Sequence, residues 1–210
     1  MDFAAWEARF ARFLAAQEGG DAAHDNAHIR RVVANAQRIA AAEGANLAVV
    51  LPAAWLHDCV TVPKTSPERS RASRMAADAA VAWLRDIGYP TEYFDAIHHA
   101  IAAHSWSARI APETLEAKTV QDADRLDALG AIGIARTLLL NGAYGILLYH
   151  AGEPFPITRP PDDRAYTVDH FYAKLLTLAE TMQTATGRAE AEARTAFMHR
   201  YLAQLGSEIA

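Results

Sequence analysis

The sequence contains little cysteine and no long apolar run, and each absence excludes a class of protein. Cys59 is the one cysteine in 210 residues, so neither a disulfide framework nor a zinc-thiolate cluster is available, and the chain suits a reducing compartment. The longest strongly apolar stretch, Leu47–Leu56, has about half the length that a membrane-spanning helix needs. Charged residues Asp2 and Glu7 interrupt the N-terminus, which lacks the apolar core of a signal peptide. We therefore expect a cytoplasmic protein.

Positive charge is also scarce. Lysine and arginine together number 20 against 25 aspartates and glutamates, which gives a net charge of −5. Because both signs are interspersed, the chain has no basic stripe that could follow a nucleic-acid backbone. We expect no nucleic acid and no membrane among the partners, and the sequence leaves the oligomeric state open.

Helical periodicity is what the sequence does contain. Apolar residues recur at intervals of three and four, and alternating strand patterns are absent, which predicts an all-α fold. The length fits a single domain over 1–210, with a metal-site core at about 20–140 and a Pro-rich loop at 151–166 before C-terminal helices over 167–206. We expect helices at roughly 2–17, 25–43, 47–60, 69–87, 91–104, 113–127, 129–141, 167–183 and 187–206.

The helix that begins at Leu47 is apolar on every side, so we expect it at the centre of the helical bundle, with Pro52 in its first turn. His57-Asp58 closes this helix. An ionisable pair at the end of a buried helix must be hydrogen-bonded, exposed at the helix end, or bound to a metal ion. The pattern alone leaves these three alternatives open.

Two further groups offer metal ligands. His24 and His28 are four residues apart, so they share a helix face, and at least one imidazole should point inward. Near the end of another predicted helix lie Asp122, Asp124 and Asp127, a concentration of negative charge that the helix dipole disfavours. Either a compensating cation or a surface acidic cluster would explain it.

The order His28, His57-Asp58, Asp124 resembles the H…HD…D pattern of the HD superfamily of metal-dependent phosphohydrolases. The surrounding stretches are similar to those of the stand-alone bacterial YedJ/YpgQ-like proteins. The matching stretches are Pro63-Lys64-x-Ser66-Pro67-x-Arg69-x-x-Ala72-Ser73, Ala103-His104-Ser105-Trp106-Ser107 and Lys118-x-Val120-Gln121-Asp122-Ala123-Asp124-Arg125-Leu126-Asp127-Ala128-Leu129-Gly130. The resemblance covers about residues 20–200.

The resemblance implies an HD-domain helical bundle in which His28, His57, Asp58 and Asp124 ligate one divalent ion. Two imidazoles and two carboxylates suit Mn²⁺, Mg²⁺, Fe²⁺, Co²⁺ or Ni²⁺, and we favour Mn²⁺. A two-metal variant of the superfamily has further histidines between the HD pair and the last aspartate. Three histidines of this chain lie in that interval: His98, His99 and His104. No carboxylate with a matching bridging role is evident, so one ion is favoured.

Several residues near these motifs are candidates for the substrate site. We expect Lys64 and Arg69 to contact phosphate, and Arg71 and Arg74 to lie on a solvated helix face. His104 is the candidate for a phosphate contact or for the proton donor to the leaving group.

The remaining candidates are supporting residues. His24 and Asp127 are candidates for orienting a ligand or water, and Cys59 for a small buried residue. The acidic residue that several HD enzymes have shortly after the HD pair is absent here.

The sequence therefore predicts a divalent-metal-dependent phosphohydrolase in which His57, Asp58 and His104 serve catalysis. The resemblance points to a small phosphorylated substrate such as a nucleotide, and hydrolysis of a nucleoside triphosphate to monophosphate and pyrophosphate is one concrete reaction. The alternative is a catalytically silent HD-fold module that senses a ligand or binds a partner. Complete metal ligands favour the enzyme, and the missing acid favours the module.

Overall fold

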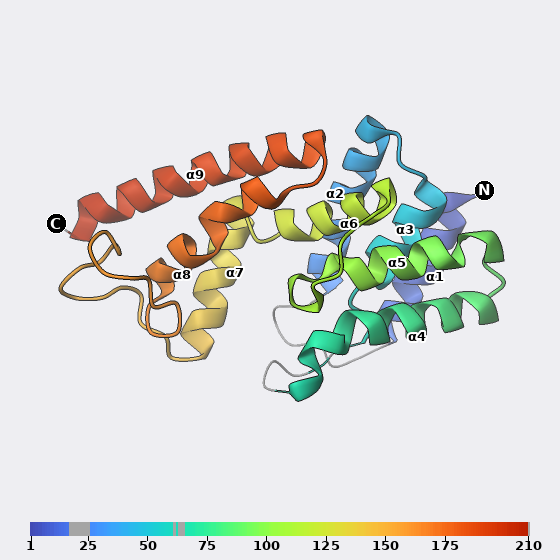
Figure 1. Ribbon diagram of the computed structural model, residues 1–210, viewed down its shortest axis with the longest axis horizontal. Coiled ribbons are helices and arrows are strands. Elements are labelled where there is room, and N and C mark those ends of the chain that lie inside the picture. The colour runs from blue at the N-terminus through green and yellow to red at the C-terminus, as the bar shows by residue number, and fades with distance from the viewer. Residues whose placement is uncertain (17–25, 61, 63–65, 210) are drawn as a thin grey trace. The chain divides into compact units, whose positions relative to one another are not determined.

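The computed structural model describes residues 1–16, 26–60, 62 and 66–209 (Figure 1). The backbone divides into two compact units, each described below by itself. The first unit comprises Met1–Asp124 and Gln183–Gly187, and the second comprises Arg125–Met182 and Arg188–Ala210. The described residues form helices and no β-strand, so the predicted all-α class is confirmed. The single-domain organisation stays a prediction.

Most helices match the predicted positions. The first unit contains α1 (Phe3–Ala15), α2 (Asn26–Glu43), α3 (Leu47–Leu56), α4 (Ala72–Asp86), α5 (Phe94–His104) and most of α6 (Leu115–Leu126). The second contains α7 (Gly130–Ala143), α8 (Thr167–Ala173) and most of α9 (Ala185–Ile209). One predicted helix, 167–183, is wrong in extent, because α8 ends at Ala173 and a separate 3-10 helix follows at Leu175–Thr181.

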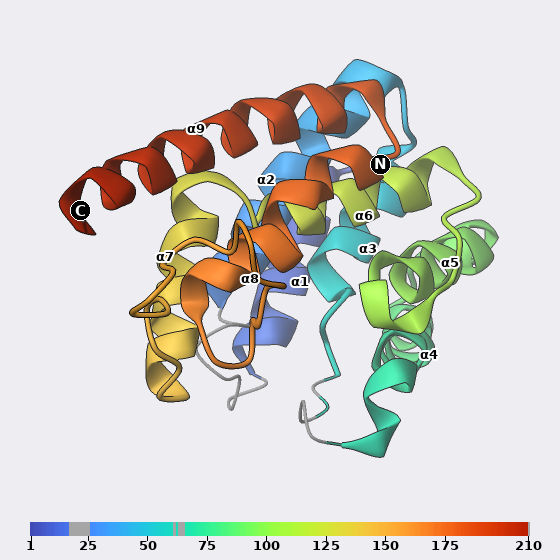
Figure 2. The ribbon, with the colours of Figure 1, turned by 60° about the vertical axis from the view of Figure 1, so that its left-hand side comes forward.

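The α3 helix is the core element of the first unit. Every residue from Ala48 to Leu56 is buried, and α3 contacts α1, α2 and α5. On the other side of α5, α4 packs along its length, and the two helices lie side by side in Figures 1 and 2. The predicted central position of α3 is therefore confirmed.

The expectation for Pro52 was wrong. Asn46 caps the helix, and its side chain accepts a hydrogen bond from the Ala48 N–H at 2.9 Å, so α3 starts at Leu47 and Pro52 lies well inside it. Proline has no N–H, which leaves the Ala48 carbonyl without its usual helical donor. The buried Tyr89 hydroxyl donates to this carbonyl oxygen at 2.7 Å. A side chain distant in sequence thus replaces the missing backbone hydrogen bond.

The Asp122 carboxylate caps the start of α9 within the first unit. Asp122 is fully buried, and its oxygens accept from the Gln183 N–H at 2.9 Å and from the Thr184 N–H at 2.8 Å. A Cβ atom on Gly187 would lie 2.5 Å from the Asp122 Oδ2, so glycine is required at that position. The surface alternative for this aspartate is wrong, and backbone N–H groups at a helix start take the place of the expected cation.

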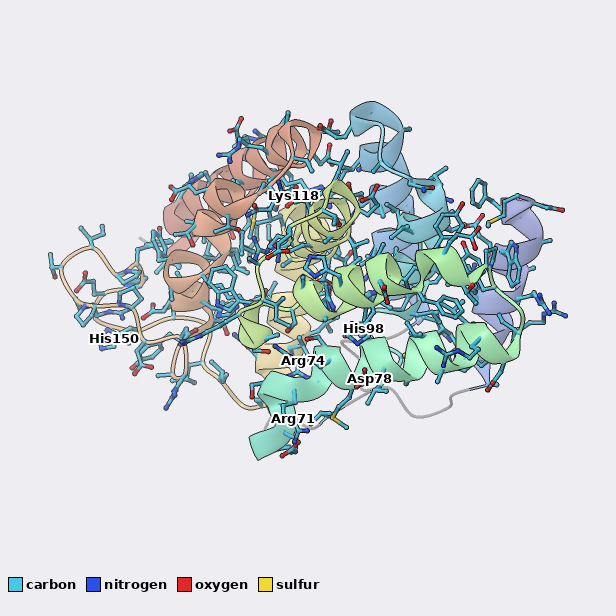
Figure 3. The ribbon with its side chains drawn as sticks, turned by 45° about the vertical axis from the view of Figure 1, so that its right-hand side comes forward. Arg71, Arg74, Asp78, His98, Lys118 and His150 are labelled. Carbon is cyan, nitrogen blue, oxygen red and sulfur yellow. The ribbon has the colours of Figure 1, made fainter. Side chains whose placement is uncertain are left out.

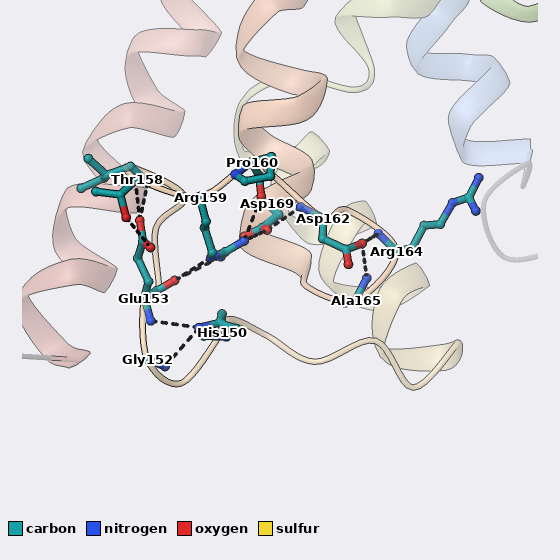
Figure 4. Close-up of polar contacts among 11 residues, drawn as sticks. His150, Gly152, Glu153, Thr158, Arg159, Pro160, Asp162, Arg164, Ala165 and Asp169 are labelled. Carbon is teal, nitrogen blue, oxygen red and sulfur yellow. Dashed lines mark hydrogen bonds and ion pairs between the residues drawn. The ribbon is translucent and has the colours of Figure 1, made fainter.

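In the second unit, α7 contacts α8, and a loop longer than the predicted 151–166 connects them (Figure 2). The Arg159 guanidinium forms an ion pair with the fully buried Asp169 carboxylate, and Asp169 also accepts from the Asp162 N–H at 2.7 Å (Figure 4). The Glu153 carboxylate closes a turn of the loop by accepting from the Ile157 and Thr158 N–H groups. We refer to Glu153, Arg159, Asp162 and Asp169 as the loop cluster.

Among the described residues, no single helix is long and apolar enough to cross a membrane. The helices α6 and α7, bent at the break between them, meet the length and composition criterion only when taken together.

Candidate metal centre

His57 directly follows α3, and the geometry of its ring leaves one nitrogen without a hydrogen bond. The Nδ1 atom lies 2.9 Å from the Ala54 carbonyl oxygen, so it must carry the proton and donate. The Nε2 atom then presents its lone pair. It is buried and has no hydrogen-bond partner among the described residues. A buried polar atom without a partner is costly in a native structure, unless a bound ion satisfies it.

This nitrogen is one of three possible metal-ligand atoms that lie close together. His28 of α2, His57 and Asp58 each offer one ligand atom, and these atoms lie within 4.8 Å of one another. The Asp124 carboxylate comes from α6, and its Oδ1 lies 3.5 Å from His28 Nε2 and 3.8 Å from His57 Nε2. The structure therefore brings together all four residues predicted as metal ligands. We call His28, His57, Asp58 and Asp124 the HD cluster.

His104, the predicted substrate contact, also reaches this cluster. It is buried at the end of α5, and its Nε2 lies 3.5 Å from Asp58 Oδ1. Its ring meets the His57 ring edge to face, with 4.8 Å between centroids. His104 is therefore the one of the three histidines between the HD pair and Asp124 that approaches the ligands.

Burial and charge act in opposite directions on the two inner histidines. Burial lowers the pKa of His57, and the Asp58 and Asp124 carboxylates offset this only in part. Neutral imidazole is the form that binds a metal ion. Burial alone would lower the pKa of His104 as well, but the nearby Asp58 and Asp124 carboxylates and the Ile101 carbonyl together raise it.

His98 and His99 form their hydrogen bonds with residues outside the HD cluster. His98 Nε2 lies 2.9 Å from an Asp78 carboxylate oxygen on the exposed side of α4 and α5, as Figure 3 shows. His99 Nε2 accepts from the Glu113 N–H at 3.0 Å. Both histidines thus form ordinary hydrogen bonds, and neither supplies a further ligand to the HD cluster.

Cys59 is buried against α4, as predicted. Its thiol lies 3.4 Å from the Ala76 carbonyl oxygen, and burial beside Asp58 raises its pKa to about 12. It is therefore a protonated packing residue and no thiolate nucleophile.

The other predicted residues have different positions. Arg71 and Arg74 are exposed, as expected (Figure 3). Arg69 donates to the Val62 carbonyl oxygen at 3.1 Å. Asp127 lies in the second unit, where it forms an ion pair with Arg136, so its expected role in orienting water stays a prediction. Lys64 and His24 lie outside the described residues.

Sequence reasoning missed two buried polar side chains that contact the end of α5. Ser73 Oγ donates to the Ala102 carbonyl at 2.9 Å, and Gln121 Nε2 donates to the Ala103 carbonyl at 2.7 Å. Both residues belong to the stretches that resemble the YedJ/YpgQ-like proteins, but no local pattern indicates that they meet the same helix end.

Comparison with known proteins now decides the family. The HD domain family model matches residues 27–129. YpgQ of Bacillus subtilis (strain 168) is 37% identical over 190 residues, which cover 89% of this chain and 84% of that protein. The chain belongs to the HD-domain family.

Solved structures of HD-domain proteins agree with this assignment. An HD-superfamily hydrolase from Bacillus thuringiensis is 35% identical with a TM-score of 0.73, over 96% of this chain and 93% of that one. The Bacillus subtilis YpgQ protein in complex with ADP is 34% identical with a TM-score of 0.72, over 96% of this chain and 92% of that one. The predicted resemblance is therefore confirmed at the level of family and fold.

Proposed function

We propose that the chain is a divalent-metal-dependent phosphohydrolase that acts on a nucleotide or another small phosphate ester. The observation that carries the proposal is the buried His57 Nε2, which has no hydrogen-bond partner in the part of the chain that the structure describes and lies among His28, Asp58 and Asp124. Four N and O donors without a thiolate suit a hard or borderline divalent ion, and Mn²⁺ is our first choice. One ion is proposed, because His98 and His99 are directed elsewhere.

The four residues of the HD cluster would hold the ion. When bound, it supplies Lewis acidity that activates water and neutralises phosphoryl charge. The chain's own groups then have separate tasks. His57 is fixed by its bond to Ala54, Asp58 contacts both His57 and His104, and His104 offers Nε2 to the substrate phosphate or to the leaving oxygen.

A nucleoside triphosphate is the concrete substrate that we propose. The water oxygen bonds to the α-phosphorus, the bond from that phosphorus to the bridging oxygen breaks, and monophosphate and pyrophosphate leave. The ADP complex of the Bacillus subtilis relative supports a nucleotide ligand. We propose that the Arg69 side chain, which lies among the described residues, binds the phosphate chain, and that Lys64 is a second cation that does so. A reducing compartment, the cytoplasm, fits the free Cys59.

The test combines metal analysis with product analysis. Purified protein is assayed for bound metal and, with Mn²⁺, for phosphate and pyrophosphate release from a panel of nucleotides. We expect Asp58→Ala to abolish release, whereas the control Asp78→Ala, which changes an exposed carboxylate on α4, should retain it. Unchanged turnover in Asp58→Ala would contradict the mechanism. Bound metal without turnover of any phosphate ester would favour the ligand-sensing module, for which the missing acid after Asp58 is the supporting observation.

A further inference from the structure

The last turn of α5 is held in an unusual way. The final carbonyls of a helix have no intrahelical donor, and glycine-based turns or water commonly satisfy them. Here the residue after α5 is Ser105 in an extended conformation. Side chains cap three consecutive carbonyls instead. The donors are His104 Nδ1 on Ile101 at 2.6 Å, Ser73 Oγ on Ala102 at 2.9 Å and Gln121 Nε2 on Ala103 at 2.7 Å.

These caps determine how His104 meets the HD cluster. Because Nδ1 donates to the Ile101 carbonyl, Nε2 is the atom that faces Asp58 Oδ1 at 3.5 Å. The ring position thus depends on the path of the backbone through the preceding residues. Ser73 on α4 and Gln121 on α6 fix that path from two other helices, and both are buried.

The hydrogen bond from Gln121 to the Ala103 carbonyl also leaves a second polar atom of Gln121 buried, which carries a free-energy cost. Its Oε1 is buried and has no hydrogen-bond partner among the described residues. An apolar side chain of similar volume would avoid this unpaired oxygen but would leave the Ala103 carbonyl without its donor, so one buried acceptor stays unpaired in either case. Departures from local rules of this kind cluster at functional sites.

We propose that Ser73 and Gln121 are positioning residues, which fix the last turn of α5 so that His104 presents Nε2 beside Asp58 and the reacting phosphate. This inference rests on the proposed function. It assigns the two side chains no contact with metal or substrate, so their effect on the reaction passes through His104 alone.

The test is a set of variants compared by kcat and KM at saturating Mn²⁺. Ser73→Ala and Gln121→Met should each lower kcat about 10-fold with little change in KM, within the roughly 10- to 100-fold range of residues that orient a reacting group. His104→Gln should lower kcat by about 100-fold or more. In the His104→Gln background the two other substitutions should have no further effect, because they act through the ring that is gone.

The matched control is Thr119→Val. Thr119 lies on the same helix as Gln121 and is fully buried, and its side-chain oxygen also has no hydrogen-bond partner among the described residues, but it makes none of the three caps. It should retain wild-type kcat. Full additivity of Gln121→Met with His104→Gln, or an equal loss of kcat in Thr119→Val, would overturn the positioning proposal.

A second readout needs no metal and no turnover. Imidazole NMR spectra of the metal-free protein should show a His104 Nδ1 proton that exchanges slowly with solvent, because it is donated to the Ile101 carbonyl, and the Ser73→Ala/Gln121→Met double variant should make this proton exchange faster. An unchanged exchange rate would overturn the proposal as well. Loss of activity in Asp58→Ala together with unchanged kcat in Gln121→Met would refute the positioning role and leave the proposed function intact.

Discussion

Two polar groupings in this chain, each built around a fully buried side chain, differ in how their hydrogen bonds are completed. In the loop cluster of the second unit, the Asp169 carboxylate accepts from both the Arg159 guanidinium and the Asp162 N–H (Figure 4). In the HD cluster of the first unit, the His57 Nε2 has no hydrogen-bond partner among the described residues, although carboxylates lie 3.7 and 3.8 Å away. The first arrangement is complete without a ligand. The second would be completed by the cation that we propose, which is why we place chemistry there.

The largest expected effect is on the incomplete cluster. His57→Asn retains a donor for the Ala54 carbonyl and removes the ring nitrogen that faces the carboxylates. Activity should fall by roughly 1,000-fold or more, because the bound ion contributes several kcal/mol to the transition state. The free energy of unfolding of the metal-free protein should change by less than about 1 kcal/mol. Metal analysis and kinetics measure the loss of the ion and of activity, and denaturant titration in the presence of a chelator measures the stability of the metal-free protein. A large loss of metal-free stability would contradict the claim that the HD cluster serves metal binding rather than folding.

Substitutions in the loop cluster should have the opposite effect, a loss of stability rather than of activity. Asp169→Ala removes one partner of a buried ion pair and leaves Arg159 uncompensated, which should cost about 3–5 kcal/mol of unfolding free energy. Asp163→Ala is the matched control, since Asp163 is only half-buried and forms an ion pair with His170, and it should cost no more than about 1 kcal/mol. Denaturant titration of both variants measures this difference in unfolding free energy. Equal effects would show that the loop cluster is no more than a surface feature.

Acid should weaken the same ion pair. Burial alone would raise the pKa of Asp169, but the hydrogen bonds from Arg159 and the Asp162 N–H lower it below its ordinary value. A carboxyl with a lowered pKa in the folded state stabilises the fold above its unfolded pKa of about 3.9 and loses that contribution as the pH falls further. The unfolding free energy should therefore decline below about pH 4, and this part of the decline should be absent in Asp169→Asn.

The smallest expected effect concerns a single backbone carbonyl in the first unit, that of Ala48, which accepts its hydrogen bond from a side chain. Tyr89→Phe removes the donor to the Ala48 carbonyl and should cost about 1–2 kcal/mol of unfolding free energy. Adding Pro52→Ala restores a backbone N–H for that carbonyl, so the double variant should recover part of the loss. Thermal and denaturant unfolding of the single and double variants measure the coupling. Strictly additive effects would show that Tyr89 does not substitute for the missing bond.

The resemblance to the HD superfamily implied the members of the HD cluster, and local patterns predicted the helices that carry them, but neither predicted the side chains that support the cluster. Apolar residues on all sides of α3 placed His57 at the end of a central helix, and the spacing of the motifs placed His28 and Asp124 on other helices. Contacts between distant residues were not predictable in this way. Asp122 caps α9 from 61 residues away in sequence, and Gln121 meets the end of α5 from 18 away. Such pairings depend on how helices pack, which periodicity does not specify.

The loop between α7 and α8 shows the same limit. Its proline and glycine content predicted an irregular segment, and that is what the structure has. The composition gave no sign that Arg159 would reach the fully buried Asp169, because a charge in a Pro-rich segment is ordinarily solvated.

The hydrogen bond from Tyr89 to the Ala48 carbonyl has a consequence for the order of events during synthesis. The hydrogen bonds of α3, which ends at Leu56, are complete only when Tyr89 is available, because Pro52 has no N–H to donate from within the helix. In a nascent chain that ends before residue 89, water is the available donor to this carbonyl. The buried hydrogen bond can therefore form only after the turn that follows α4 has been translated.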